Sequence, residues 1–68
     1  MAMAEVALFL REMPSGKLRV SLRAKEPWDV AAVAAQFGGG GHKLASGCSL
    51  DGPPEAAVEA MLAALSAP

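Results

Sequence analysis

Residues 38–47 read Gly-Gly-Gly-Gly-His-Lys-Leu-Ala-Ser-Gly, and they hold the residue types best suited to binding an anion. Glycine loses the most backbone freedom on folding, so a folded domain keeps such a run where the backbone needs positive φ or where a ligand approaches the main chain. Gly38 to Gly41 could offer backbone N–H groups as a nest for an oxyanion such as phosphate, with His42 and Lys43 beside it. The alternative is a flexible loop that only joins two elements.

A second group of polar residues lies on one predicted strand. Polar and apolar residues alternate over residues 17–23, so Arg19, Ser21 and Arg23 share one strand face. A guanidinium can hold a phosphate through two parallel N–H bonds, and a hydroxyl can add a third. These residues favour phosphate binding, although a solvated outer strand face would carry similar residues.

Groups that could catalyse hydrolysis or hold a metal ion are not arranged for that work. The chain has one cysteine and one histidine, which cannot build a metal cage. The acidic residues fall at predicted strand ends, caps and helix starts, without metal-ligand spacing. No G-x-S-x-G nucleophile motif is present. The sequence therefore predicts a binding module with no catalytic residue, metal or cofactor of its own.

Composition limits the remaining classes of protein. With 68 residues the chain is one small domain, and its net charge of −1 excludes a general electrostatic attraction to nucleic acid. No apolar run approaches the ~18 residues of a membrane span. The start of the chain lacks the pattern of a signal peptide. We therefore expect a cytoplasmic protein without membrane contact.

Periodicity predicts a hairpin followed by a helix. Residues 5–12 and 17–23 form two strands joined by a turn at 13–16. Asp29 is a suitable N-cap for a helix whose apolar face is made by the residues at i, i+3, i+4 and i+7, namely Val30, Val33, Ala34 and Phe37. Gly38 is placed to end that helix.

A third strand and a second helix complete the predicted elements. The strand covers residues 47–50, and the helix follows a turn at 51–55 and buries a stripe of Val58, Met61, Leu62 and Leu65. The order β-β-α-β-α predicts a two-layer α/β fold with a small mixed sheet and both helices on one face.

Two structural consequences follow from this arrangement. The loop of Gly38 to Gly41 should be ordered, with at least one positive φ. The strand from Val6 to Leu10 is apolar on both faces, but helices on one side of the sheet cover only one of them. We therefore expect weak homo-association through residues of this strand, which include Ala7, Leu8 and Phe9.

The motifs together resemble a known family. The segment from Val30 to Gly47, in which F-G-G-G-G-H-K-L-A-S-G follows an alanine-rich helix, resembles the C-terminal DHH-associated domain of DHH-family phosphoesterases. That domain typically shows G-G-G-H, two variable residues, and A-A-G or a close relative. Residues 20–24, V-S-L-R-A, are similar to its V-S-x-R-S strand. Ala24 stands where serine is common, and Ser46 stands where alanine is common.

The resemblance implies a division of labour. In that family a separate DHH domain holds manganese and performs hydrolysis, and the DHH-associated domain grips the nucleotide. By resemblance the substrate-binding positions are Ser21, Arg23, Gly39, Gly40, Gly41 and His42. Related bacterial enzymes degrade short oligoribonucleotides or 3′-phosphoadenosine 5′-phosphate. We therefore expect residues 1–68 to be the C-terminal part of such a domain, without its catalytic partner, and to bind a short oligonucleotide or phosphonucleotide.

Two other functions remain open. One is a complete small hydrolase that acts after self-association, which the lack of metal ligands disfavours. The other is a dimerisation or interaction module that binds no ligand in isolation, which the retained phosphate-site residues disfavour.

Overall fold

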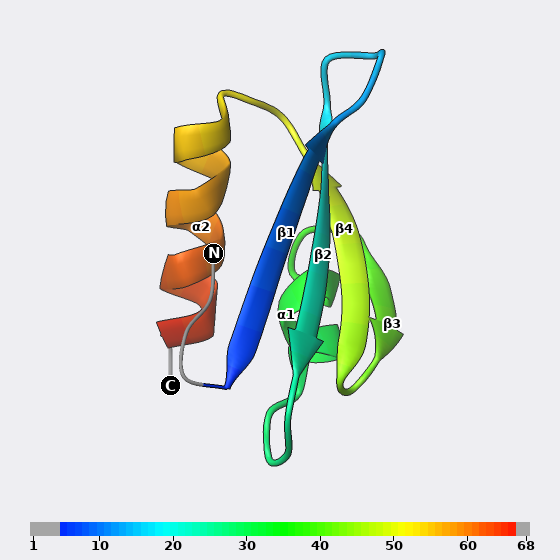
Figure 1. Ribbon diagram of the computed structural model, residues 1–68, viewed down its shortest axis with the longest axis vertical. Coiled ribbons are helices and arrows are strands. Elements are labelled where there is room, and N and C mark those ends of the chain that lie inside the picture. Colours follow the sequence, from blue (N-terminus) through cyan, green and yellow to red (C-terminus); the bar gives the residue numbers. More distant parts are fainter. Residues whose placement is uncertain (1–4, 67–68) are drawn as a thin grey trace.

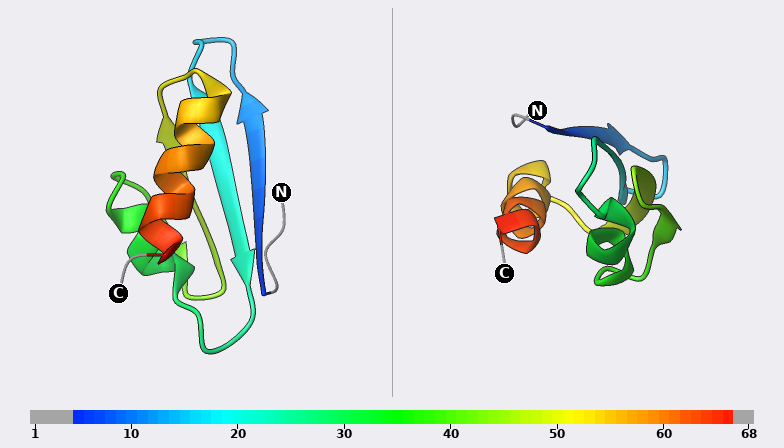
Figure 2. Two further views of the ribbon diagram at one scale, coloured as in Figure 1. Left: turned by 90° about the vertical axis from the view of Figure 1, so that its left-hand side faces the viewer. Right: turned by 90° about the horizontal axis from the view of Figure 1, so that it is seen from below.

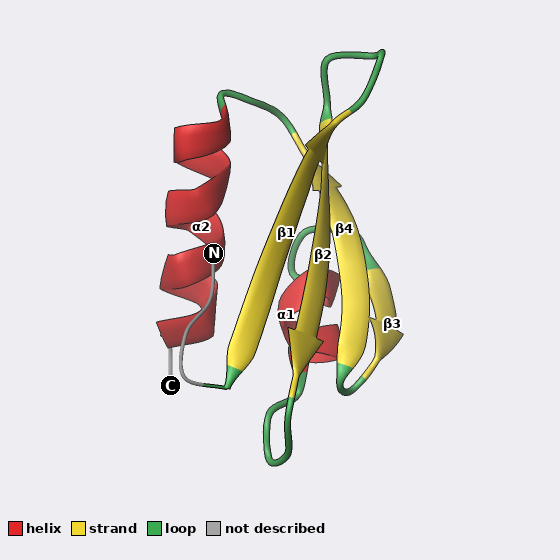
Figure 3. Ribbon diagram, in the orientation of Figure 1, coloured by secondary structure: helices red, strands yellow, loops and turns green. Residues whose placement is uncertain are grey.

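The computed structural model describes residues 5–66, which form one antiparallel sheet covered on one face by two helices (Figures 1 and 3). The elements in chain order are β1 (Val6–Glu12), β2 (Leu18–Ala24), α1 (Val30–Ala35), β3 (Gly40–His42), β4 (Ala45–Leu50) and α2 (Pro54–Ser66). The sheet has the strand order β1-β2-β4-β3. Figure 2 shows both helices on the same side of the sheet, which confirms the predicted two-layer α/β class.

The predicted hairpin is present and supplies half of the sheet. β1 pairs with β2 in an antiparallel register in which Leu8 lies opposite Leu22. The turn is closed by two backbone bonds, from the Met13 N–H to the Lys17 carbonyl and from the Gly16 N–H to the Met13 carbonyl. The apolar residues of β2 are buried, as their alternation predicts.

The core lies between the sheet and the helices. Val20 and Leu22 have no solvent exposure, and Val30 and Met61 reach them from the two helices. These residues belong to one cluster that also contains Val6, Leu8, Val33, Ala34, Cys48 and Leu65. Val6 and Leu8 are therefore buried within the chain and cannot contribute to homo-association, because the helices already cover that face of β1.

Helix α1 begins and ends where the sequence predicts. The Asp29 carboxylate accepts a hydrogen bond from the Ala32 N–H at 3.1 Å and caps the first turn. Gly38 takes φ +80°, and its N–H donates to the Ala35 carbonyl while the Gly39 N–H donates to the Ala34 carbonyl. This bond pair is a Schellman motif, in which a glycine with positive φ stops the helix.

The predicted element order lacked one strand. β3 and β4 form a second hairpin with a two-residue turn at Lys43 and Leu44, so the order is β-β-α-β-β-α. Glycines have low strand propensity, and a Lys-Leu turn lacks the Asn-Gly or Asp-Gly signal of a tight hairpin. The additional strand also reverses the chain, so β4 runs antiparallel to β2 and the sheet is not mixed.

A buried hydroxyl joins β4 to the start of α1. Ser46 Oγ donates to the Val30 carbonyl at 2.7 Å, and Ser46 is only 7% exposed. The Val30 N–H also donates to the Lys43 carbonyl at 2.8 Å. The turn that follows His42 is thus tied to the helix behind the sheet.

We expect Ser46→Ala to lower the free energy of unfolding by about 1 kcal/mol, because it removes this buried hydrogen bond without adding bulk. Ser49→Ala on the same strand, where the side chain is exposed, should change it by less than about 0.5 kcal/mol. Urea denaturation followed by circular dichroism measures both values. Equal stability of the two variants would show that the Ser46 bond contributes nothing.

Helix α2 closes the inner layer. It buries Ala57, Met61 and Leu65, while Val58 and Leu62 of the predicted stripe are half-buried. Pro54 occupies its first turn, where a missing N–H costs no intrahelical bond. Neither helix in the described range has the length and apolar content needed to span a bilayer.

Candidate anion-binding face

The face of the sheet opposite the helices carries the predicted binding residues, and we call it the outward face. Leu18, Val20 and Leu22 point to the helices, so the alternate residues of β2 point outward. The register of the neighbouring strands then gives the outward positions: Ala7, Phe9 and Arg11 on β1; Arg19, Ser21 and Arg23 on β2; Ala45, Gly47 and Ser49 on β4; Gly40 and His42 on β3.

Arg23 and His42 lie on the outward face in one row. Arg23 is the Cα partner of Ala45, and Ala45 is the Cα partner of His42. Two strand spacings separate Arg23 from His42, which is about 10 Å between their Cα atoms. The small Ala45 side chain lies between them, so both longer side chains can reach one anion seated above Ala45. The register thus places Arg23 and His42 on the same side of the sheet.

Both side chains keep donors available for a ligand. His42 Nδ1 accepts a bond from the Leu44 N–H at 3.4 Å, so the neutral ring carries its proton on Nε2. Arg23 Nη1 donates to the Leu22 carbonyl at 3.0 Å, which uses one of five guanidinium donors. Both residues are exposed. The row can therefore present a fixed guanidinium and an imidazole donor to the same phosphate.

Two of the four glycines end helix α1 and two belong to β3. This corrects the prediction that the backbone N–H groups of Gly38 to Gly41 together form an anion-binding nest. The N–H groups of Gly38 and Gly39 satisfy the last carbonyls of α1 and do not face a ligand, because a helix end leaves those carbonyls without intrahelical partners. Gly40 and Gly41 belong to β3, which is an edge strand. An edge strand presents backbone groups on its open side. The predicted positive φ is present at Gly38 and at Gly41, where φ is +140°.

Beside the Arg23 row, the outward face has a row of small residues, which we call the floor. Ser21, Gly47 and Gly40 form the next row, in which only Ser21 carries a side chain. A methyl group built on Gly40 meets nothing within 4 Å, so this position is open. Gly39, in contrast, packs its backbone against Gly47 and Cys48. The structure thus brings Ser21, Arg23, Gly40 and His42 to one surface and places Gly39 behind it as a support.

Gly47 belongs to this floor but was not among the predicted binding residues. The sequence feature that could have indicated Gly47 is that every second residue from Ala45 to Ser49 is small, namely Ala45, Gly47 and Ser49. In a strand these three residues share one face. That signal depends on knowing that β4 starts at Ala45, two residues before the predicted start.

Other reactive groups lie outside this face. Burial raises the pKa of the Cys48 thiol, while the Arg19 guanidinium acts in the opposite direction. Cys48 is 1% exposed and packs in the core, as a small apolar residue does. Among residues 5–66, no three His, Cys, Asp or Glu side chains are grouped in a way that could hold a metal ion.

Two comparisons with known proteins bear on the family of this chain. The DHHA1 domain model matches residues 1–67. Oligoribonuclease NrnB of Bacillus subtilis (strain 168) is 44% identical over 43 residues, which cover 62% of this chain. The same alignment covers 11% of the Bacillus protein, so the chain spans a small part of the length of this relative.

Proposed function

The chain belongs to the DHHA1 domain family, and from this premise we propose that it is the substrate-binding module of a DHH-family phosphoesterase. Its substrate is a short oligonucleotide or a phosphonucleotide. The relative named as an oligoribonuclease supports this substrate class. The observation that carries the proposal is the row in which Arg23 and His42 flank Ala45 on the face that no helix covers.

In this proposal one phosphate is seated above Ala45. The Arg23 guanidinium forms two parallel N–H bonds to its oxygens, and His42 Nε2 donates a third. Ser21 and the backbone N–H group that the Gly40–Gly41 stretch of β3 leaves on its open side bind the same nucleotide, since successive strand residues direct their N–H groups to opposite sides. A phosphate carries its charge over several oxygens, so a planar fork opposite an imidazole donor suits it better than two separate point charges.

Hydrolysis belongs to a different part of the parent enzyme in this proposal. The family resemblance assigns it to a DHH domain that holds manganese, and the described residues of this chain contain no comparable ligand set. Binding as proposed needs no metal on this chain. The DHH domain is accordingly a proposed partner, across a cleft whose near wall is the outward face.

An interaction module is the second candidate function, and Phe9 is the observation that favours it. Phe9 is 59% exposed on the outward face and is the exposed large apolar side chain within residues 5–66. Arg11 and Arg19 lie beside it, so two copies meeting through this face would bring arginines together. Like charges oppose such a contact. Nucleotide binding is therefore favoured over face-to-face pairing, and weak homo-association stays a prediction.

The test is an NMR titration of the ¹⁵N-labelled chain with adenosine 5′-monophosphate at low salt. We expect saturable shifts at the amides of Arg23, Gly40 and His42. Amides on the solvent side of α2, such as those of Glu59 and Ala63, serve as the internal control and should not move. Shifts confined to other surfaces, or none at millimolar nucleotide, would contradict the proposal.

A further inference from the structure

A second cluster of cationic and aromatic side chains lies next to the proposed phosphate site on the outward face. Arg11 is the Cα partner of Arg19, and Phe9 is the Cα partner of Ser21. Along β1, Phe9 therefore stands between Ala7 and Arg11. The three side chains of Phe9, Arg11 and Arg19, all exposed, form what we call the second cluster.

The Arg19 side chain lies across the sheet, over Gly47, although it is exposed. A methyl group built on Gly47 would come within 2.8 Å of Arg19 Nη2 and 3.2 Å of its Cζ. Gly47 is buried although it lies on the outward face, because this guanidinium covers it. Gly47 is two residues along β4 from Ala45, which is about 7 Å. The Arg19 guanidinium thus lies one row away from the proposed phosphate position, outside the ~2.9 Å reach of a charge-assisted bond to it.

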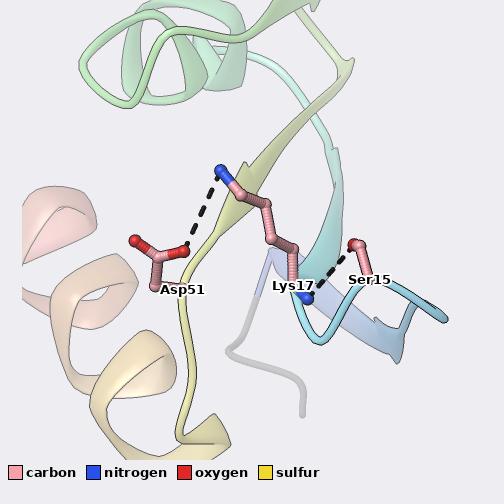
Figure 4. Close-up of polar contacts among 3 residues, drawn as sticks. All are labelled: Ser15, Lys17 and Asp51. Carbon is pink, nitrogen blue, oxygen red and sulfur yellow. Dashed lines mark hydrogen bonds and ion pairs between the residues drawn. The ribbon is translucent and has the colours of Figure 1, made fainter.

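The arginines of the second cluster have no acidic partner on the sheet. Among the described strands the only acidic residue is Glu12, whose partner Leu18 faces the helices. Arg11 and Arg19 are directly opposite one another, and like charges in that position destabilise a sheet. Lys17, which precedes β2, differs because its Nζ lies 3.9 Å from Asp51 Oδ1 (Figure 4). On the described strands, the cations without an acidic partner are therefore Arg11, Arg19 and Arg23.

We infer, on the basis of the proposed function, that the second cluster binds the next nucleotide of a single-stranded oligonucleotide. Arg19 and Arg11 hold its phosphate, and the exposed ring of Phe9 stacks on its base. An aromatic side chain between cations is the arrangement that binds single strands without sequence preference, since every base offers a π-face. A duplex keeps its bases stacked on one another and cannot use Phe9 in this way.

The inference predicts that affinity depends on substrate length. Two probes at 50 mM salt test it by NMR titration: adenosine 5′-monophosphate and 5′-phosphorylated triadenylate. The wild-type chain should bind the trinucleotide at least tenfold more tightly than the mononucleotide, because a charge-assisted contact and a stacked base are each worth about that factor. Arg19→Gln and Phe9→Leu should reduce this ratio to below about threefold and leave mononucleotide affinity unchanged.

Lys17→Gln is the matched control, because it removes one positive charge just before β2, at a residue already paired with Asp51. It should leave both affinities unchanged. Arg19→Gln should also lower the salt dependence of trinucleotide binding by about 0.7 in the slope of log K against log salt. The amide spectra of the variants, unchanged away from the substitution, show that each remains folded.

The outcomes separate this inference from the proposed function. Two results would overturn the proposed role of the second cluster and leave the proposed function standing. One is a wild-type chain that binds both probes equally. The other is an Arg19→Gln variant that loses mononucleotide affinity as strongly as trinucleotide affinity. A wild-type chain that binds neither probe at the outward face overturns the proposed function itself. Equal losses in Lys17→Gln and Arg19→Gln would show a general charge effect and would also overturn the inference.

Discussion

Gly39→Ala is expected to lower the free energy of unfolding by about 3 kcal/mol. This is a large share of the total free energy of unfolding of a domain of this size. A methyl group at this position would fall on the Gly47 carbonyl oxygen and come within 2.7 Å of Cys48 Cβ. The first of these neighbours is backbone, so no side chain can rotate away. The path from α1 into β3 would have to move off β4, and Gly39 lies where the two are closest.

The neighbouring residue supplies the control for this prediction. At Gly40 an added methyl group meets nothing within 4 Å, and φ is not positive. Gly40→Ala should therefore keep or raise the free energy of unfolding by about 0.5 kcal/mol, because it restricts the unfolded chain. Urea denaturation of the two variants, with the wild type alongside, measures the difference. If Gly39→Ala is as stable as Gly40→Ala, the close approach to β4 does not constrain the glycine run.

Arg23→Lys is expected to weaken binding of adenosine 5′-monophosphate about tenfold, although the charge is kept. Lysine replaces a planar fork with a point charge, so one of two parallel bonds to the phosphate is lost. Arg23→Gln should weaken binding by about tenfold to a hundredfold, because the charge is lost as well. NMR titration gives both affinities. Since the Arg23 side chain is exposed, neither change should lower stability by more than about 0.5 kcal/mol.

Lys17→Gln is again the comparison, because it removes a charge that lies just before β2 and is already paired with Asp51. It should leave mononucleotide affinity unchanged. Equal affinities of the wild type and Arg23→Lys would contradict the bidentate role. Equal losses in Arg23→Gln and Lys17→Gln would mean that the chain attracts nucleotide only through its overall charge.

The local elements were largely predictable, because their signals lie within a few residues of each other. Alternation from Lys17 to Arg23 was enough to place the outward cations on one strand face. Asp29 and Gly38 marked the two ends of α1, since capping depends on residue type and on a positive φ that glycine adopts without strain. The family resemblance was likewise carried by contiguous motifs, and the match over residues 1–67 confirms it.

The sequence by itself determined the fold class, the hairpin, the two helices and the residue types of the proposed phosphate site. Only the tertiary structure decided that Gly40–His42 is a strand, because glycines pair there only through the hydrogen bonds and close contact that β4 offers. That strand sets the register of Arg23, Ala45 and His42, and it assigns Gly38 and Gly39 to the helix end instead of the ligand. The pairing of β2 with β4 in turn brings the Arg19 guanidinium over Gly47. Such relations join residues far apart in the chain, and no local pattern encodes them.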